Sequence, residues 1–125
     1  MYEVSVDESF AAAHNLRNYH GKCEDLHGHN YKVRVTLAGK ELDSSGLLYD
    51  FVHLKQVTQG VIRSLDHRYL NELKPFDTLN PSAENLARYI YDETSKQLIM
   101  KSLNGAGVAS VTVWETDTAA ATYRP

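Results

Sequence analysis

Residues 27–38 read HGHNYKVRVTLA, and this stretch decides the fold. From position 31 every second residue is apolar: Tyr31, Val33, Val35 and Leu37. The period of two residues is that of a β-strand with one buried face. The start of the chain has the same period, with Tyr2, Val4 and Val6 between polar neighbours. The sequence therefore predicts a strand over about residues 2–13 and a second one reaching residue 38.

The rest of the chain predicts two helices and two further strands. Residues 39–46 form a turn, after which Asp50 caps a helix that ends near Asp66. A second helix begins near Pro81 and ends before residue 104, and two last strands flank a turn at 116–118. The order ββααββ favours an α+β fold in which the helices cover one face of a four-stranded antiparallel sheet. Two open sheet edges suggest that copies of the chain associate through their sheets.

Composition narrows the function classes. A chain of 125 residues suits one domain, residues 1–125. The net charge of −3 is spread along the chain without a basic stripe, so no nucleic acid is expected as a partner. No apolar run is long enough for a membrane span, and the first residues lack a signal peptide's pattern. We expect a cytoplasmic protein with no membrane partner.

Three histidines suggest a metal site. His27 and His29 project to one face if the second strand begins at residue 27, and His14 ends the first strand. Three imidazoles and an open fourth position are typical of catalytic zinc. Copper, iron and nickel accept the same ligands, so zinc is the best single choice and the spacing alone does not fix it. The alternative interpretation is that these are ordinary polar histidines near a turn.

Six blocks of the sequence carry a family resemblance. They are FAAAH at 10–14, CEDLHGHNY at 23–31, DFVHLK at 50–55, LDHRYLN at 65–71, NPSAEN at 80–85 and VWET at 113–116. In this order they resemble the 6-pyruvoyltetrahydropterin and 6-carboxytetrahydropterin synthases. The resemblance implies the tunnelling fold, a homohexamer built as a dimer of trimers with active sites between subunits, and a pterin substrate, 7,8-dihydroneopterin triphosphate. It also implies that His14, His27 and His29 hold Zn²⁺.

The same resemblance implies roles for further residues. Cys23 matches the catalytic base, Asp66 and His67 match a catalytic carboxylate–imidazole pair, and Glu115 matches the anchor of the pterin ring. Without the resemblance, Asp66 and His67 would be read as a helix end, and Glu115 as one partner of a structural salt bridge. Ser82 matches a pterin contact, although capping of the second helix explains it equally well. Arg17, Lys22, Lys32, Arg68 and Arg124 are candidate cations for a triphosphate, and the sequence does not choose among them.

The loop before His27 bears on the reaction. The short gap between Cys23 and His27 resembles the lyases that form 6-carboxy-5,6,7,8-tetrahydropterin in queuosine biosynthesis, releasing acetaldehyde and triphosphate. Glu24 resembles the glutamate of a related subgroup that cleaves the side chain to give 6-hydroxymethyl-7,8-dihydropterin for folate. Two alternatives therefore stay open: this cleavage, alone or as a second activity using Glu24, and a non-catalytic module that binds zinc or pterin.

Overall fold

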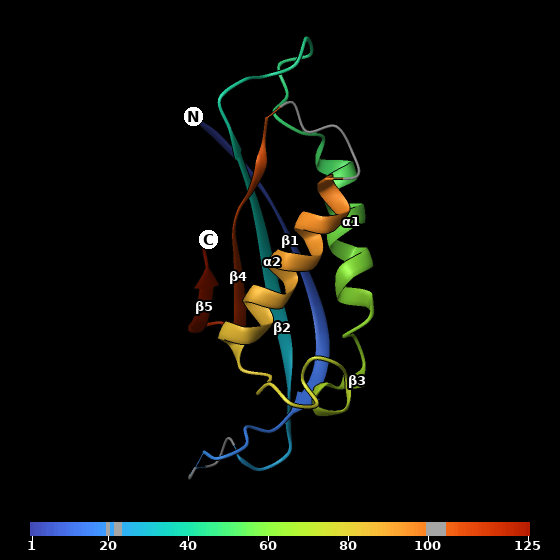
Figure 1. Cartoon of the computed structure of the whole chain (residues 1–125), viewed down its shortest axis with the longest axis vertical. Helices are drawn as coiled ribbons and strands as arrows, with labels where there is room; N and C mark the ends of the chain where they lie inside the picture. Colours follow the sequence, from blue (N-terminus) through green and yellow to red (C-terminus); the bar gives the residue numbers. More distant parts are fainter. Residues whose placement is uncertain (20, 22–23, 100–104) are drawn as a thin grey trace.

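The computed structural model describes residues 1–19, 21, 24–99 and 105–125. Its strands form one sheet of order β3-β1-β2-β4-β5, built from the segments below. They are β1 (Tyr2–His14), β2 (His27–Gly39), β3 (Arg68–Tyr69), β4 (Gly107–Thr116) and β5 (Ala119–Tyr123). The helices α1 (Phe51–Arg63) and α2 (Ala83–Ile99) lie side by side on one face of the sheet (Figure 1). The predicted α+β fold is confirmed.

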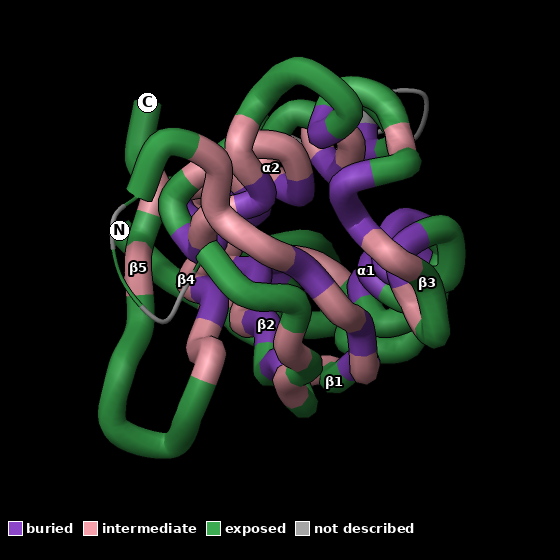
Figure 2. The backbone as a smooth tube through the Cα atoms, turned by 90° about the horizontal axis from the view of Figure 1, so that it is seen from below, coloured by how far each residue is buried: buried purple, intermediate pink, exposed green. Residues whose placement is uncertain are grey.

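The predicted alternation places the core between the sheet and the helices. Val33, Val35 and Leu37 of β2 are fully buried on the helix-facing side. They meet the apolar faces of α1 and α2, whose buried residues include Leu54, Val57, Leu86 and Ile90. Buried residues accordingly concentrate between the two layers (Figure 2). No helix in the described part of the chain has the length and apolar character needed to cross a bilayer.

The helices begin at the predicted caps. The carboxylate of Asp50 accepts a hydrogen bond from Val52 N at 2.8 Å and so satisfies one of the unpaired N–H groups at the start of α1. Ser82 Oγ does the same for Asn85 N at 3.2 Å before α2. The capping interpretation of Ser82 therefore holds whatever else this side chain does.

Two details differ from the prediction. α1 ends at Arg63, earlier than the predicted end near Asp66, and beyond it Leu65 N donates to Ile62 O, three residues back instead of four, so the last turn is tighter than an α-helix. The chain then forms β3, a two-residue strand that pairs parallel to Ala12 and Ala13 of β1. The short parallel strand was not predicted, because two residues are too few to show a period. The order is therefore ββαβαββ, with the predicted four strands forming the antiparallel part of the sheet.

Candidate metal centre and active site

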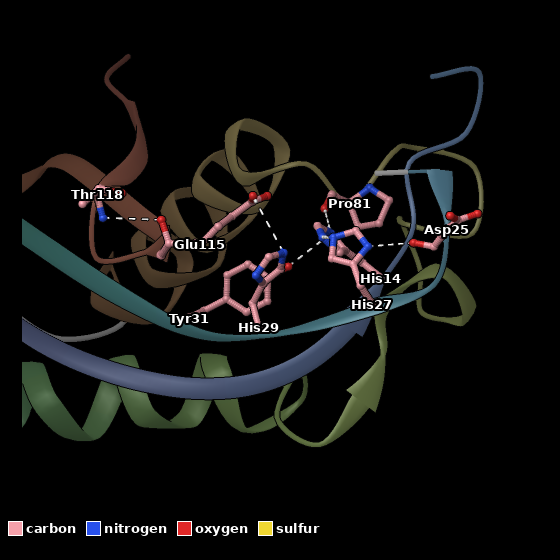
Figure 3. Close-up of polar contacts among 9 residues, drawn as sticks. His14, Asp25, His27, His29, Tyr31, Pro81, Glu115 and Thr118 are labelled. Carbon is pink, nitrogen blue, oxygen red and sulfur yellow. Dashed lines mark hydrogen bonds and ion pairs between the residues drawn. The ribbon is translucent and has the colours of Figure 1, made fainter. Parts of the chain in front are cut away.

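Strand register brings the three histidines together at one end of the sheet. β1 and β2 pair antiparallel with His14 directly opposite His27, and His29 follows on the same face two residues later. The candidate ligand nitrogens of the three rings all lie within 4.8 Å of one another. The three imidazoles point toward one another from adjacent strands (Figure 3). The predicted three-histidine cluster is confirmed as a group that can hold a metal ion.

Backbone carbonyls fix which nitrogen of each ring is available. His14 Nδ1 lies 2.6 Å from the carbonyl oxygen of Pro81, and His27 Nδ1 lies 2.7 Å from that of Asp25. A carbonyl only accepts hydrogen bonds, so each Nδ1 must carry the proton and donate it. The lone pair of each ring is then on Nε2. This arrangement of outer partners orients histidines as metal ligands.

The two Nε2 atoms would repel each other without a cation between them. They are 2.9 Å apart, and with both protons on Nδ1 neither atom can donate. A hydrogen bond between them requires a second proton on one ring, and burial lowers the pKa of His14, which opposes that charge. Neutral imidazole is the form that binds a metal. A metal ion bound by both rings would remove this repulsion, because each lone pair would bind the ion.

His29 gives an independent indication. Its Nε2 is buried and has no hydrogen-bond partner among the described residues. Glu115 Oε2 is near but 3.9 Å away, beyond hydrogen-bond distance. Burial also lowers the pKa of His29. A buried polar atom without a partner is costly unless something else binds it, and a metal ion shared with His14 and His27 would do so. The donor set of three imidazoles thus fits zinc.

Tyr31 lies beneath the cluster. Its ring is fully buried and stacks on Phe10 with 4.8 Å between ring centroids. The hydroxyl is 3.1 Å from His14 Nδ1, so this nitrogen has two oxygen neighbours, Tyr31 and Pro81. Burial, with a smaller contribution from the charge of Glu115, raises the pKa of Tyr31, and the phenol stays neutral. Tyr31 therefore supports the orientation of His14 without carrying charge.

An open groove of about 620 Å³ lies between the start of α2 and β5. Glu115 and Ser82, the two predicted pterin contacts, both line it, together with Leu16, Tyr19 and residues 119–122. The Glu115 side chain is 28% exposed, so its carboxylate is accessible from the groove. The structure thus places both residues beside one space, and Glu115 Oε2 lies 3.9 Å from His29 Nε2.

Asp66 and His67 form a pair away from this groove. Asp66 Oδ1 accepts hydrogen bonds from Ala11 N at 2.9 Å and from His67 Nδ1 at 3.0 Å. These donors, the Ala11 N–H first, hold the pKa of Asp66 below its usual value. The His67 side chain is 82% exposed and lines a second hollow of about 570 Å³ with residues 11–13 and 28–30. His67 has a left-handed φ of 58°, and its N–H donates to Ala11 O at 2.6 Å.

The remaining predicted residues lie in the loop between β1 and β2. Cys23 lies outside the described residues. Glu24 is exposed, and its N–H donates to Gly21 O at 3.1 Å. The carbonyls of Asp25 and Pro81, which orient the histidines, were not foreseen from the sequence. Any residue type can supply a carbonyl, so neither position carried a signal.

Comparison with known proteins identifies the family of this chain. The family model of 6-pyruvoyl tetrahydropterin synthase matches residues 3–125. The chain is 36% identical to 6-carboxy-5,6,7,8-tetrahydropterin synthase of Bacillus subtilis, over 99% of this chain and 86% of that protein. It is 38% identical to dihydroneopterin monophosphate aldolase of Pyrococcus furiosus, over 72% of each. The solved structure of 6-pyruvoyl tetrahydropterin synthase from Caenorhabditis elegans superposes with a TM-score of 0.87 at 30% identity, over 99% of this chain and 95% of that one. The chain therefore belongs to the 6-pyruvoyl tetrahydropterin synthase family.

Proposed function

We propose that this protein is a zinc-dependent lyase that converts 7,8-dihydroneopterin triphosphate to 6-carboxy-5,6,7,8-tetrahydropterin, with release of acetaldehyde and triphosphate. The observation that carries the proposal is the convergence of His14, His27 and His29, with His29 Nε2 3.9 Å from the carboxylate of Glu115, which lines the groove. The Bacillus subtilis relative, which bears the name of this activity, favours it over other reactions of the family. A place in queuosine biosynthesis and a cytoplasmic location belong to the same proposal.

Glu115 is proposed to bind the pterin ring. A carboxylate can accept two parallel hydrogen bonds from an amino group and a neighbouring ring N–H, which fixes both position and orientation. Its 3.9 Å separation from His29 Nε2 supports the role, because a ring held there would have its side chain close to the metal ligands. Ser82 lines the same groove and is proposed as a second contact.

Proton transfer is proposed for residues around the metal. Zn²⁺ held by the three histidines would act as a Lewis acid that makes the protons of the substrate side chain more acidic. Cys23, four positions before His27, is proposed to remove such a proton as the thiolate. Its loop joins β1 to β2, the two strands that carry the histidines.

Asp66 and His67 are proposed to complete the site of a neighbouring subunit. The carboxylate of Asp66 holds His67 Nδ1, which leaves Nε2 as the atom that exchanges protons with a substrate. His67 lines a different hollow from Glu115 and Ser82, so within one chain its imidazole does not line their groove. Its exposure supports an active site between subunits, and we propose the hexamer as the working form.

Side-chain cleavage to 6-hydroxymethyl-7,8-dihydropterin is the second candidate function. It is favoured by the aldolase of Pyrococcus furiosus among the relatives and by Glu24, a carboxylate next to Cys23. Glu24 would then serve as a second base. Both reactions act on the same substrate class and leave one side-chain carbon on the ring. In the first this carbon becomes a carboxyl group while the ring goes from dihydro- to tetrahydropterin, and in the second it stays a hydroxymethyl group.

Product analysis distinguishes these functions. Zinc-loaded protein is incubated with 7,8-dihydroneopterin triphosphate, and the pterins are identified by mass while acetaldehyde is assayed separately. The carboxylated product with acetaldehyde supports the first function, and the hydroxymethyl product supports the second. Cys23→Ala should abolish the first product, and Glu24→Gln should reduce only the second. Full metal occupancy without any product would instead indicate a non-catalytic binding module.

A further inference from the structure

The chain immediately after β1 is held by two asparagine side chains. Asn71 Oδ1 accepts a hydrogen bond from Asn15 N at 3.0 Å, and Asn71 Nδ2 donates to Asn15 O at 2.9 Å. Asn80 repeats the pattern at the next position but one, with Arg17 N and Arg17 O each at 2.9 Å. Each side-chain amide thus pairs with both polar groups of one residue, as a neighbouring strand would. Residues 15–17 are fixed against residues 71–80 without belonging to a strand.

The side chain of Arg17 adds further hydrogen bonds between the same two segments. Its guanidinium donates to the carbonyls of Phe76 at 2.8 Å and Asn71 at 3.2 Å, with a longer contact of 3.5 Å to Leu79 O. Carbonyls in a loop have no ladder to satisfy them, and one planar guanidinium can serve several at once. These bonds engage the side chain, so among the candidate cations for a triphosphate Arg17 has a different use.

These contacts flank the bond that orients a metal ligand. Asn15 directly follows His14, and Asn80 directly precedes Pro81, whose carbonyl accepts from His14 Nδ1 at 2.6 Å. Asn85 Nδ2 also donates to Asn80 O at 2.9 Å, which ties this point to α2. Both backbone segments that form the His14–Pro81 bond are therefore fixed at the adjacent residue.

We propose that Arg17, Asn71 and Asn80 are positioning residues of the metal centre, which set the affinity of His14 for the ion by holding the Pro81 carbonyl on its Nδ1. The inference rests on the proposed function insofar as the three histidines bind zinc. None of the three residues contacts the cluster itself in the described structure. Their effect is exerted through one hydrogen bond, which keeps the lone pair of His14 on Nε2.

The test compares zinc affinity in Arg17→Met and Arg88→Met. Arg88 is the control, because its guanidinium contacts Asp92 at 3.8 Å and the ring of Tyr123 at 5.1 Å, and neither of these residues belongs to the metal centre. Zn²⁺ binding is measured by competition with a chromophoric chelator, and folding by circular dichroism. Loss of an outer partner of a metal ligand typically weakens binding about 10–100-fold, so we expect a loss of this size in Arg17→Met and none in Arg88→Met.

Nitrogen-15 NMR of the imidazoles supplies a readout that a merely structural role would not change. In metal-free wild-type protein His14 should show a protonated Nδ1, and in Arg17→Met a mixture of the two tautomers. If Arg17→Met does not fold, Asn80→Asp is used, since it keeps the acceptor for Arg17 N and loses the donor to Arg17 O. Its zinc affinity should fall by several-fold.

The outcomes separate the two proposals. Failure of wild-type protein to bind Zn²⁺ would overturn the metal centre itself. Tight binding by wild type with unchanged affinity and unchanged His14 tautomer in the folded variants would overturn the positioning role alone. Weaker binding with a shifted tautomer, while Arg88→Met behaves as wild type, supports it.

Discussion

Two buried tyrosine hydroxyls offer a matched test of the hydrogen bond beneath the metal centre. Tyr31 OH is 3.1 Å from His14 Nδ1, whereas Tyr49 OH has no hydrogen-bond partner among the described residues. Burial raises the pKa of both phenols, so each is neutral near pH 7. Replacing each tyrosine by phenylalanine removes one oxygen and leaves the ring. The two variants therefore differ mainly in whether a hydrogen bond is lost.

The expected magnitudes follow from these partners. A net intramolecular hydrogen bond contributes about 0.5–1.5 kcal/mol, and His14 Nδ1 keeps its shorter bond to Pro81, so Tyr31→Phe should destabilise metal-free protein by about 1 kcal/mol. Tyr49→Phe removes a buried group without a partner and should be neutral or stabilising by up to about 1 kcal/mol. The unfolding free energies of the two variants should thus differ by about 1–2 kcal/mol. Zinc affinity should fall, by up to about tenfold, only in Tyr31→Phe.

Urea denaturation at one fixed protein concentration measures the difference, because association would make apparent stability depend on concentration. Equal slopes of free energy against urea are required before the values are compared. A result in which Tyr49→Phe is the more destabilised variant would refute the reasoning. So would an unchanged stability of Tyr31→Phe, since the 3.1 Å contact would then contribute nothing.

Three further predictions concern α1, an exposed ion pair and the metal centre. Gly60→Ala should stabilise α1 by about 0.5–1 kcal/mol in thermal or urea unfolding, because an added Cβ meets nothing within 4 Å and alanine loses less backbone entropy. Arg34 lowers the pKa of Asp7, so their pair should add stability above pH 3.8 that is lost as the pH falls through the lower folded pKa. Because the pair is exposed, the unfolding free energies of wild type and Asp7→Asn should differ by less than about 1 kcal/mol at pH 7 and should be equal near pH 2. A difference in unfolding free energy that grows in acid would contradict the assignment. Zn²⁺ at a hundred times its dissociation constant should raise the unfolding free energy by about 2.7 kcal/mol, and His29→Ala should lose most of that gain in the same titration.

The position of β3 was decided by the tertiary structure and not by a local sequence pattern. Residues 68 and 69 are too few to show the two-residue period of a strand. They pair with β1 because the turn after α1 places them beside its edge. Next to this edge contact, His67 lines a different hollow from Glu115. The sequence therefore predicts Asp66 and His67 as a pair, but it does not predict which groove they face.

Sequence by itself determined the face on which the ligands lie. Side chains two residues apart project to the same side of a strand, so HGH at 27–29 places both histidines together, and the alternation after it defines the core side. Only the folded chain decided the register that sets His14 opposite His27, and the carbonyls of Asp25 and Pro81 that select Nε2 as the ligand atom. The physical reason is that strand periodicity is local and depends on residue type. Bonds from side chains to loop carbonyls depend on the folded path of the loop: Pro81 lies 67 residues from His14 in sequence, and even Asp25, two residues from His27, is placed by the loop conformation. Every residue type carries the same carbonyl, so no residue type signals such a bond.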